Sequence, residues 1–379
     1  MNRTLLLAFN FPPHGGGIAR MMGELALRYP PQSLIVSTGR EPDSAVSDAR
    51  FPQPVDRAGI RGTRLRTLNG LALWTWRAGR LARAYAPGFT WCAELKPAGY
   101  PARWLAWRRG IPYGVVVHGT ELLLLDAKIR RSRFKRWTGE LARSVYERLG
   151  RADLARRVEV VPLGTTPEHF RPGIDPRSAR AKFGLDGGPW LLTVARLEWH
   201  KGIDTVIRAL PAVRARHPGT RYAVAGVGPR RPELERLAQD LGVAAAVRFL
   251  GSVSDDDLPG LYNAATLYVG ASRRYELLAE GFGISLVEAS ASGLAVVGGD
   301  SGGVADAVRD GETGILVNPE DPAAVAAGIV RLLDDEGLRA RLGAGGRRAV
   351  ETYYNWDRVA RDFIRIDAAA RRPSSPGAR

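Results

Sequence analysis

The sequence predicts an α/β protein of two doubly wound domains, each a parallel sheet covered by helices on both faces. Three observations indicate this class. The chain has 379 residues, more than a single ordinary hydrophobic core accommodates. Its short apolar runs lack the alternation that is typical of half-exposed strands. Stretches with helical periodicity separate these runs, as crossover helices separate parallel strands.

The C-terminal half shows this repeat most regularly. We expect strands at residues 190–195, 222–226, 247–251, 267–270 and 294–298. Helical patterns cover residues 203–210, 233–241, 285–292 and 356–370. The first of these helices should end before Pro211, because proline lacks a backbone N–H and clashes with the preceding turn.

The N-terminal half is less regular, with strand patterns at residues 5–9, 33–37 and 113–117 and a helical pattern at 18–27. The first apolar run leads into Pro12-Pro13 and three glycines rather than a small-residue cleavage site, so we expect a buried strand and not a signal peptide. Three prolines punctuate residues 162–172, where a domain boundary is expected. The expected parts are a first domain at 1–168, a second at 169–355, a helix to 372 that packs back on the first domain, and a disordered tail at 373–379.

Positive charge is concentrated in the first half of the chain. The net charge is +16, and residues 1–170 hold 27 Lys and Arg against 13 Asp and Glu, whereas the remainder holds 28 against 26. Such a surface suits nucleic acid, anionic lipid or an acidic small molecule. No apolar run approaches the roughly 20 residues that span a bilayer.

Arginine and tryptophan alternate along part of this basic half. The residues concerned are Arg61, Arg64, Arg66, Trp74, Trp76, Arg77, Arg80, Arg83 and the run at 130–136. This pattern could dock the first domain on the anionic inner face of a cell membrane. The alternative is a set of ordinary solvated helices in an arginine-rich protein.

Cys92 is the single cysteine, which excludes an intramolecular disulfide and a zinc site built from several thiolates. We interpret it as a packed small side chain in a cytoplasmic protein.

The segment from Glu280 to Glu288 carries the strongest functional signal. Gly283, Ile284 and Ser285 open a helix, whose free N–H groups and dipole favour an anion such as a diphosphate. Glu288 lies one turn later, where it can accept hydrogen bonds from ribose hydroxyls. The alternative is a capping box formed by Ser285 and Glu288, which needs no ligand but leaves Glu280 and the glycines unexplained.

Arg196 and Lys201 follow the strand expected at 190–195, at the edge of the sheet where open α/β folds bind ligands. Two cations on one loop suit a diphosphate, with arginine as a bidentate fork and lysine as a point charge. By itself such a pair is also compatible with a solvated surface loop.

Two weaker signals lie in the first half. Residues 12–18 join the first strand to the first helix through Gly15, Gly16 and Gly17, either as a phosphate cradle or as a plain tight turn. This is not the dinucleotide fingerprint, so an oxidoreductase is disfavoured. His118 follows the strand at 113–117 and is a candidate site residue, although a lone histidine can be structural. No metal-ligand spacing is present, and Asp255-Asp-Asp257 is interpreted as a helix N-terminus.

Together these motifs resemble the retaining GT-B glycosyltransferases of family GT4, over most of the chain. The likeness rests on residues 11–20, 118–121, 161–164 with 170–172, 195–202, 226–228, 249–251, the Glu-x7-Glu of Glu280 and Glu288, 301–303 and 311–317. It implies two Rossmann-like domains facing a cleft and is nearest to the phosphatidylinositol mannosyltransferases. The implied partners are a nucleotide-sugar donor and a lipid-linked or other glycan acceptor, without nucleic acid, metal or cofactor.

The resemblance also implies a role for each residue. Arg196 and Lys201 would neutralise the departing diphosphate, and Glu280 with the backbone of 283–285 would hold the donor sugar and phosphate. The remaining implied contacts are Glu288 to the ribose, Gly16 and Gly17 to the diphosphate, His118 to the sugar, and Gly228, Leu250 and Gly251 to the base.

One departure from the family pattern concerns residues 126–140, where an expected strand of the first domain is missing or degenerate. This motivates a second hypothesis, a GT-B scaffold protein that has lost activity. A third is a basic nucleic-acid-binding protein, which would leave the donor-site pattern unexplained.

Overall fold

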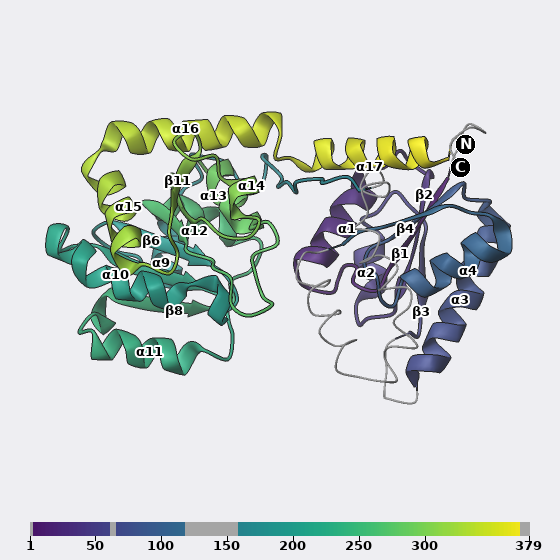
Figure 1. Cartoon of the computed structure of the whole chain (residues 1–379), viewed down its shortest axis with the longest axis horizontal. Coiled ribbons are helices and arrows are strands. Elements are labelled where there is room, and N and C mark those ends of the chain that lie inside the picture. The colour runs from purple at the N-terminus through teal and green to yellow at the C-terminus, as the bar shows by residue number, and fades with distance from the viewer. Residues whose placement is uncertain (1–2, 61–65, 118–157, 372–379) are drawn as a thin grey trace. The chain divides into compact units, whose positions relative to one another are not determined.

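The computed structural model describes residues 3–60, 66–117 and 158–371 and divides the chain into two units. Unit 1 comprises Met1–Val161 and Trp356–Arg379, and unit 2 comprises Pro162–Asn355. The division falls earlier than the expected limit at residue 168, because Leu163 packs against a core of unit 2 and Thr165 pairs with Asn355. Figure 1 shows both units, with the strands of each lying between layers of helices.

Unit 1 is a parallel sheet with strand order β3-β2-β1-β4-β5. Its described strands are β1 (Thr4–Ala8), β2 (Leu34–Gly39), β3 (Val55–Ala58), β4 (Phe89–Cys92) and β5 (Tyr113–Val115). Its described helices are α1 (Gly17–Arg28), α2 (Ser44–Asp48), α3 (Arg66–Tyr85), α4 (Gly99–Arg109) and α17 (Trp356–Ala370). Figure 1 shows α3 and α4 on one side of this sheet and α1 on the other.

Two of the residues proposed to face a membrane, Trp74 and Arg77, instead hold α3 on the sheet of unit 1. Trp74 is buried, its side chain 1% exposed, and its indole N–H donates to Ser37 Oγ at 3.0 Å. The neighbouring Arg77 forms an ion pair with Asp56. Both residues therefore serve the packing of α3 on the sheet, whereas Trp76 remains 52% exposed. Arg61 and Arg64 and the run at 130–136 lie outside the described residues, and the side chain of Arg66 is not described.

Unit 2 is a parallel sheet with strand order β11-β10-β9-β6-β7-β8. Its strands are β6 (Trp190–Val194), β7 (Arg221–Ala225), β8 (Val247–Gly251), β9 (Leu267–Gly270), β10 (Val296–Gly299) and β11 (Gly314–Val317). Its helices are α9 (Arg177–Phe183), η1 (Trp199–Lys201), α10 (Ile203–Arg216), α11 (Arg231–Asp240), η2 (Ala244–Ala246), α12 (Leu258–Ala264), α13 (Ile284–Ala291), α14 (Val304–Ala307), α15 (Pro322–Asp334) and α16 (Glu336–Thr352).

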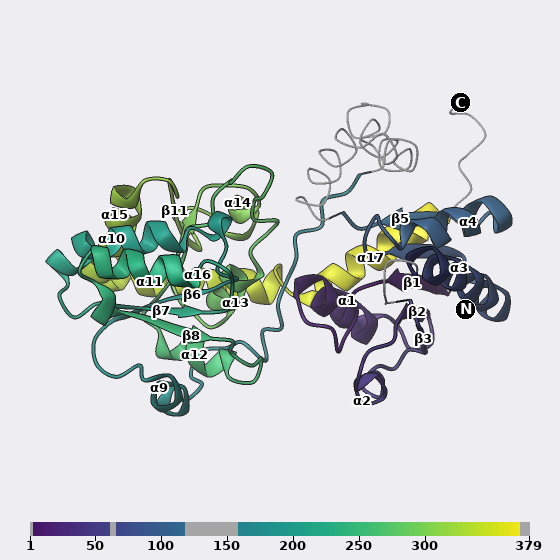
Figure 2. The same cartoon turned by 90° about the horizontal axis from the view of Figure 1, so that it is seen from below.

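Successive residues of each strand face opposite cores in unit 2. Leu191 and Val224 belong to a core shared with α10 and α15, and Leu192 and Ala223 to a second core shared with α12 and α13. In Figure 2 the sheet accordingly lies between α10 and α11 on one side and α9 and α12 on the other. Burial on both faces explains why these strands are continuously apolar in sequence.

Helix α10 departs from the sequence prediction. It continues through Pro211 to Arg216 instead of ending before the proline. Leu210 and Val213 are fully buried in the core that α10 shares with α15, and this packing outweighs the hydrogen bond that Pro211 cannot donate. By contrast, α12 begins directly after Asp257, so the interpretation of the aspartate triplet as a helix N-terminus is confirmed.

The last helix, α17, packs on unit 1 although unit 2 precedes it in the chain. Phe363 contacts the ring of Trp91, with the ring centroids 4.7 Å apart. The carboxylate of Asp367, 4% exposed, accepts a hydrogen bond from Thr4 Oγ1 at 2.6 Å and pairs with Arg371. Tyr29 also donates to Asp367, so β1, α1 and α17 meet at one buried carboxylate.

The net charge differs more between the two structural units than between the two halves of the sequence. Unit 1 contains 33 Lys and Arg against 15 Asp and Glu, whereas unit 2 contains 22 against 24.

Cys92 is buried in β4, as the sequence predicts, and burial raises the pKa of its thiol. None of the described helices has both the length and the apolar character needed to cross a bilayer.

We predict that Asp367→Ala lowers the stability of the protein by about 3 kcal/mol, because it leaves the half-buried Arg371 without its carboxylate partner. The midpoint of thermal unfolding measures the loss. The matched control is Asp357→Ala, which removes an exposed ion pair between α17 and Arg28. It should cost less than about 1 kcal/mol. Equal midpoints for the two variants would contradict the anchoring role of Asp367.

Candidate functional site

The candidate site lies where the strand order of unit 2 changes direction. β6 pairs with both β7 and β9, so chain connections leave these neighbouring strands toward opposite halves of the sheet. Ligands of open α/β sheets bind beyond the carboxyl ends of strands at such a switch point. The two loops that begin there are 195–202, after β6, and 271–283, after β9.

These two loops touch backbone to backbone. Gly202 has a φ of +64°, and a Cβ at this position would lie 1.8 Å from the carbonyl oxygen of Ala271. Only glycine permits this approach. The N–H of Arg273 donates to the carbonyl of His200 at 2.8 Å, and its guanidinium pairs with the buried Asp204 at the start of α10. The loop after β9 is therefore fixed to the loop after β6.

Lys201 and Glu280 meet across this contact. The Lys201 Nζ lies 2.7 Å from Glu280 Oε2, and the same oxygen accepts a hydrogen bond from Ser272 Oγ at 2.9 Å. Burial alone would raise the pKa of the Glu280 carboxyl, but Lys201 and the Ser272 hydrogen bond outweigh burial and hold that pKa below its usual value. The site thus holds an ionised carboxylate beside an ammonium group.

Arg196 remains available to a ligand. Its side chain is 72% exposed and pairs with Glu198 at 2.8 Å. His200 is buried behind this loop, and burial together with the nearby Lys201 lowers the pKa of its imidazole. The loop therefore presents one exposed and one half-shielded cation, with a histidine that favours the neutral state beneath them.

The start of α13 is set by glycine and not by serine. Gly283 is the N-cap residue, with a φ of +92°, and no side chain caps this end of the helix. Ser285 lies inside the first turn, where its hydroxyl accepts a hydrogen bond from Tyr268 at 2.7 Å. The capping-box interpretation of Ser285 and Glu288 is therefore wrong. The backbone N–H groups at the helix start remain suited to an anion.

Glu288 is more enclosed than the sequence suggests. It is 3% exposed, and Oε2 accepts a hydrogen bond from the hydroxyl of Tyr262 at 2.8 Å. Tyr262 comes from α12 and is itself fully buried. The carboxylate is thus held rigidly between α12 and α13, one turn after the start of α13.

The residues predicted to border a base lie at the carboxyl ends of β7 and β8. Gly228 packs directly on the backbone of Leu197, where a Cβ would lie 2.5 Å from the carbonyl oxygen. Gly251 ends β8, and its carbonyl accepts a hydrogen bond from Gly226 at 2.7 Å. Leu250 is partly buried. These residues adjoin the Arg196 loop through Leu197.

Unit 1 contributes a separate candidate. Gly16 caps α1 with a φ of +111°, Gly17 is the first residue of the helix, and both are exposed. They follow β1, which is the switch-point strand of this sheet because it pairs with β2 and β4. His118 lies outside the described residues.

Sequence reasoning missed several residues that build the site. Ser272 follows the end of β9 and is the residue whose position could have revealed it, since polar residues just beyond strand ends line such sites. Arg273 and Asp204 gave no comparable signal. A further group surrounds Trp199, whose ring stacks on Tyr275 at 5.5 Å and carries the guanidinium of Arg230 on a ring face.

Comparisons with known proteins agree with this arrangement. Residues 176–349 match the family described as glycosyl transferases group 1. A GDP-mannose-dependent alpha-(1-6)-phosphatidylinositol monomannoside mannosyltransferase from Mycobacterium tuberculosis is 30% identical over 98% of this chain and 100% of its own length. The chain belongs to the glycosyl transferases group 1 family. It is accordingly a glycosyltransferase.

Other similarities are partial or structural. A D-inositol 3-phosphate glycosyltransferase from Acidothermus cellulolyticus is 40% identical over 57% of this chain and 49% of its own length. The Anabaena protein HepE, solved in complex with UDP and glucose, matches with a TM-score of 0.77 and 18% identity over 97% of this chain and 100% of that one. The fold of this glycosyltransferase is therefore GT-B, as its sequence predicts.

We predict a pH-dependent stability loss for Lys201→Met. In the native protein the lowered Glu280 pKa stabilises the fold above about pH 4.3, the unfolded value, and this contribution is lost as the pH falls through the folded pKa. Without Lys201 burial dominates and raises that pKa, so the variant should lose about 3 kcal/mol at pH 7. The deficit should shrink toward pH 4 as Glu280 takes up a proton.

Thermal unfolding at both pH values measures this difference. Lys182→Met is the matched control, because it removes an exposed lysine paired with Asp257 on the surface of the same unit. The role assigned to the Lys201–Glu280 pair fails if the two lysine variants lose the same stability at pH 7.

Proposed function

We propose that this glycosyltransferase moves a hexose from a nucleoside-diphosphate sugar to a lipid-linked acceptor with retention at the anomeric carbon. The observation that carries the proposal is the ammonium group of Lys201 at the switch point of unit 2. It lies beside the half-buried Glu280 and on the same edge of the sheet as the N-terminus of α13. This arrangement suits a diphosphate that carries a sugar.

The cations have a clear chemical task in such a reaction. The bond between the anomeric carbon and the diphosphate oxygen breaks, and negative charge develops on that oxygen. Arg196 and Lys201 would stabilise this charge, and fixed donors are most effective where charge develops. Glu280, ionised and held by Ser272, would accept hydrogen bonds from donor sugar hydroxyls once the diphosphate draws Lys201 toward itself.

Retention would follow from attack on the face from which the diphosphate leaves. The acceptor oxygen forms the new bond to the anomeric carbon, and its proton passes to the departing phosphate oxygen. In this scheme the protein supplies position and charge rather than a nucleophile. We further propose that no metal takes part, because Arg196, Lys201 and the start of α13 can offset the diphosphate charge.

GDP-mannose is the first donor to test, because the relative that matches over the whole chain is named for it. That relative is also named for a phosphatidylinositol monomannoside acceptor, which supports a lipid-linked acceptor here. UDP-glucose is the second donor, since HepE was also solved in complex with it. Unit 1, with its excess of positive charge, would hold the acceptor.

We also propose that unit 1 docks on the anionic inner face of a membrane. Trp76, Arg80 and Arg83 are exposed on α3, which keeps this part of the sequence hypothesis open. Indole and guanidinium groups favour the membrane interface. Co-sedimentation with vesicles that contain phosphatidylglycerol tests the idea at moderate salt.

We predict that GDP or GDP-mannose, without added metal, raises the unfolding temperature of the protein. A ligand at about 100 times its Kd stabilises the folded state by about 2.7 kcal/mol. Glu288→Gln keeps the shape of the side chain and should abolish this shift. Glu336→Gln, at an exposed position on α16, is the control and should leave it intact.

The outcomes separate the competing hypotheses. A shift with UDP and not GDP would change the donor base but not the site. A shift without sugar transfer or hydrolysis would indicate an inactive scaffold. No shift with any nucleoside diphosphate would refute the donor site.

We predict that Arg196→Ala lowers turnover by about 100-fold or more, the usual cost of losing one donor to developing charge. Its unfolding temperature should stay close to that of the native protein, because the side chain is largely exposed. Arg208→Ala, at an exposed position on α10, is the control. Native turnover in Arg196→Ala would remove this residue from the mechanism.

A further inference from the structure

A groove lies between α3 and α4 on unit 1. The two helices pack side by side and border an open groove of about 740 Å³. This volume falls in the range of small-ligand sites, roughly 300–1,000 Å³. It is lined only by residues of unit 1 and has no part in the candidate site of unit 2.

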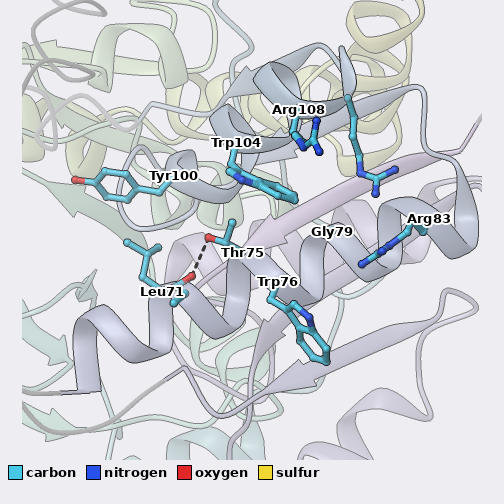
Figure 3. Close-up of a pocket in the computed structure, with 10 residues that line it drawn as sticks. Leu71, Thr75, Trp76, Gly79, Arg83, Tyr100, Trp104 and Arg108 are labelled. Carbon is cyan, nitrogen blue, oxygen red and sulfur yellow. Dashed lines mark hydrogen bonds between the residues drawn. The ribbon is translucent and has the colours of Figure 1, made fainter.

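The groove changes character along its length. Leu71, Ala72 and Tyr100 line one end, and Arg83, Arg108 and Arg109 line the other. Figure 3 shows this order, with Leu71 and Tyr100 on one side of Trp104 and with Arg83 and Arg108 on the other. The hydroxyl of Thr75 donates to the Leu71 carbonyl at 2.8 Å. Its hydrogen is therefore not available to a ligand in the wall between the two ends.

The cationic end is not neutralised by the residues described. Neither α3 nor α4 contains an aspartate or glutamate. Within the described part of the chain, Arg83, Arg108 and Arg109 have no ion pair, whereas Arg77 on the same helix pairs with Asp56. The ends of two helices supply about −0.5 charge each. Three guanidinium groups therefore leave a net positive end that suits an anion.

The apolar part is kept open by Gly79. A Cβ at this position would lie 3.0 Å from the ring of Trp104, so the indole rests across the glycine instead of being pushed into the groove. Trp76, which also lines the groove, carries the guanidinium of Arg80 over its ring at 5.1 Å. Trp107 on α4 is 79% exposed. Exposed indoles are typical of surfaces that meet a membrane interface.

We propose that this groove binds one acidic phospholipid, with its phosphate at the three arginines and the upper part of an acyl chain at Leu71, Ala72 and Tyr100. The inference rests on the proposed membrane docking of unit 1 and names the lipid contact that makes it specific. Apolar and cationic ends in one groove match a molecule with both parts. A free phosphate would use the arginines alone.

The test measures the partition of the full chain between solution and vesicles of phosphatidylcholine with or without phosphatidylglycerol. Arg83→Ala with Arg108→Ala removes two of the three phosphate contacts, and we expect binding to acidic vesicles to fall about 30-fold. The charge-matched control is Arg40→Ala with Arg50→Ala, at exposed positions elsewhere on unit 1, with a loss below about threefold.

A second pair of variants separates the groove from general charge. Ala72→Trp fills the apolar end without changing charge, and we expect it to lower binding about tenfold, a change of about 1.4 kcal/mol. Ala84→Trp adds the same side chain at an exposed position of α3 outside the groove and should not weaken binding. Unfolding temperatures establish that each variant folds.

Four outcomes would overturn the proposal. Equal losses in the two arginine pairs would mean that diffuse charge holds the membrane. Native binding by Ala72→Trp would mean that no acyl chain enters the groove. Full displacement from vesicles by inorganic phosphate, at constant ionic strength, would indicate an anion site alone. Absence of vesicle binding by the native protein would end the membrane proposal too, while the nucleotide shift would still report on glycosyltransferase function.

Discussion

The candidate site depends on one close contact, that between Gly202 and the carbonyl of Ala271. A side chain at residue 202 would push apart the loops that follow β6 and β9. Lys201 precedes that glycine, and Ser272 follows that alanine, so the contact sets the distance over which Lys201, Ser272 and Glu280 interact. The hydrogen bond from Arg273 to His200 closes the same junction from the other side. Chemistry at this edge of the sheet therefore rests on backbone packing as much as on charged side chains.

Burial and the pairing with Lys201 together set the ionisation state of Glu280. A buried carboxylate without a cation would hold a proton at neutral pH. With Lys201 beside it, the carboxylate is ionised and ready to accept hydrogen bonds. The same pairing shields half of the positive charge that the site offers to an incoming diphosphate, whereas Arg196 remains exposed. The two cations thus differ. Arg196 is exposed for first contact with an anion, whereas Lys201 must exchange Glu280 for the anion.

Sequence patterns predicted the fold of unit 2 well, because strands buried on both faces leave continuous apolar runs. They predicted less of unit 1, where β3 and β4 have four residues each and flank α3, a long helix rich in arginine and tryptophan. Lys201 and Glu280 could be found from their places after strands. The burial of Glu288 by Tyr262 could not, since it depends on how α12 meets α13. Trp74 and Trp76 lie two residues apart, and only the helix position decides that one is core and the other surface.

The packing of α17 on unit 1 affects how the protein can fold during its synthesis. Unit 2 is one continuous stretch of chain, whereas unit 1 combines the segment before unit 2 with the segment after it. On the ribosome the strands of unit 1 emerge first but cannot receive the buried Asp367 until unit 2 has been synthesised. Domains usually fold as units, in order of their synthesis. Here the order of completion is reversed, because the basic unit lacks α17 until all of unit 2 has been translated.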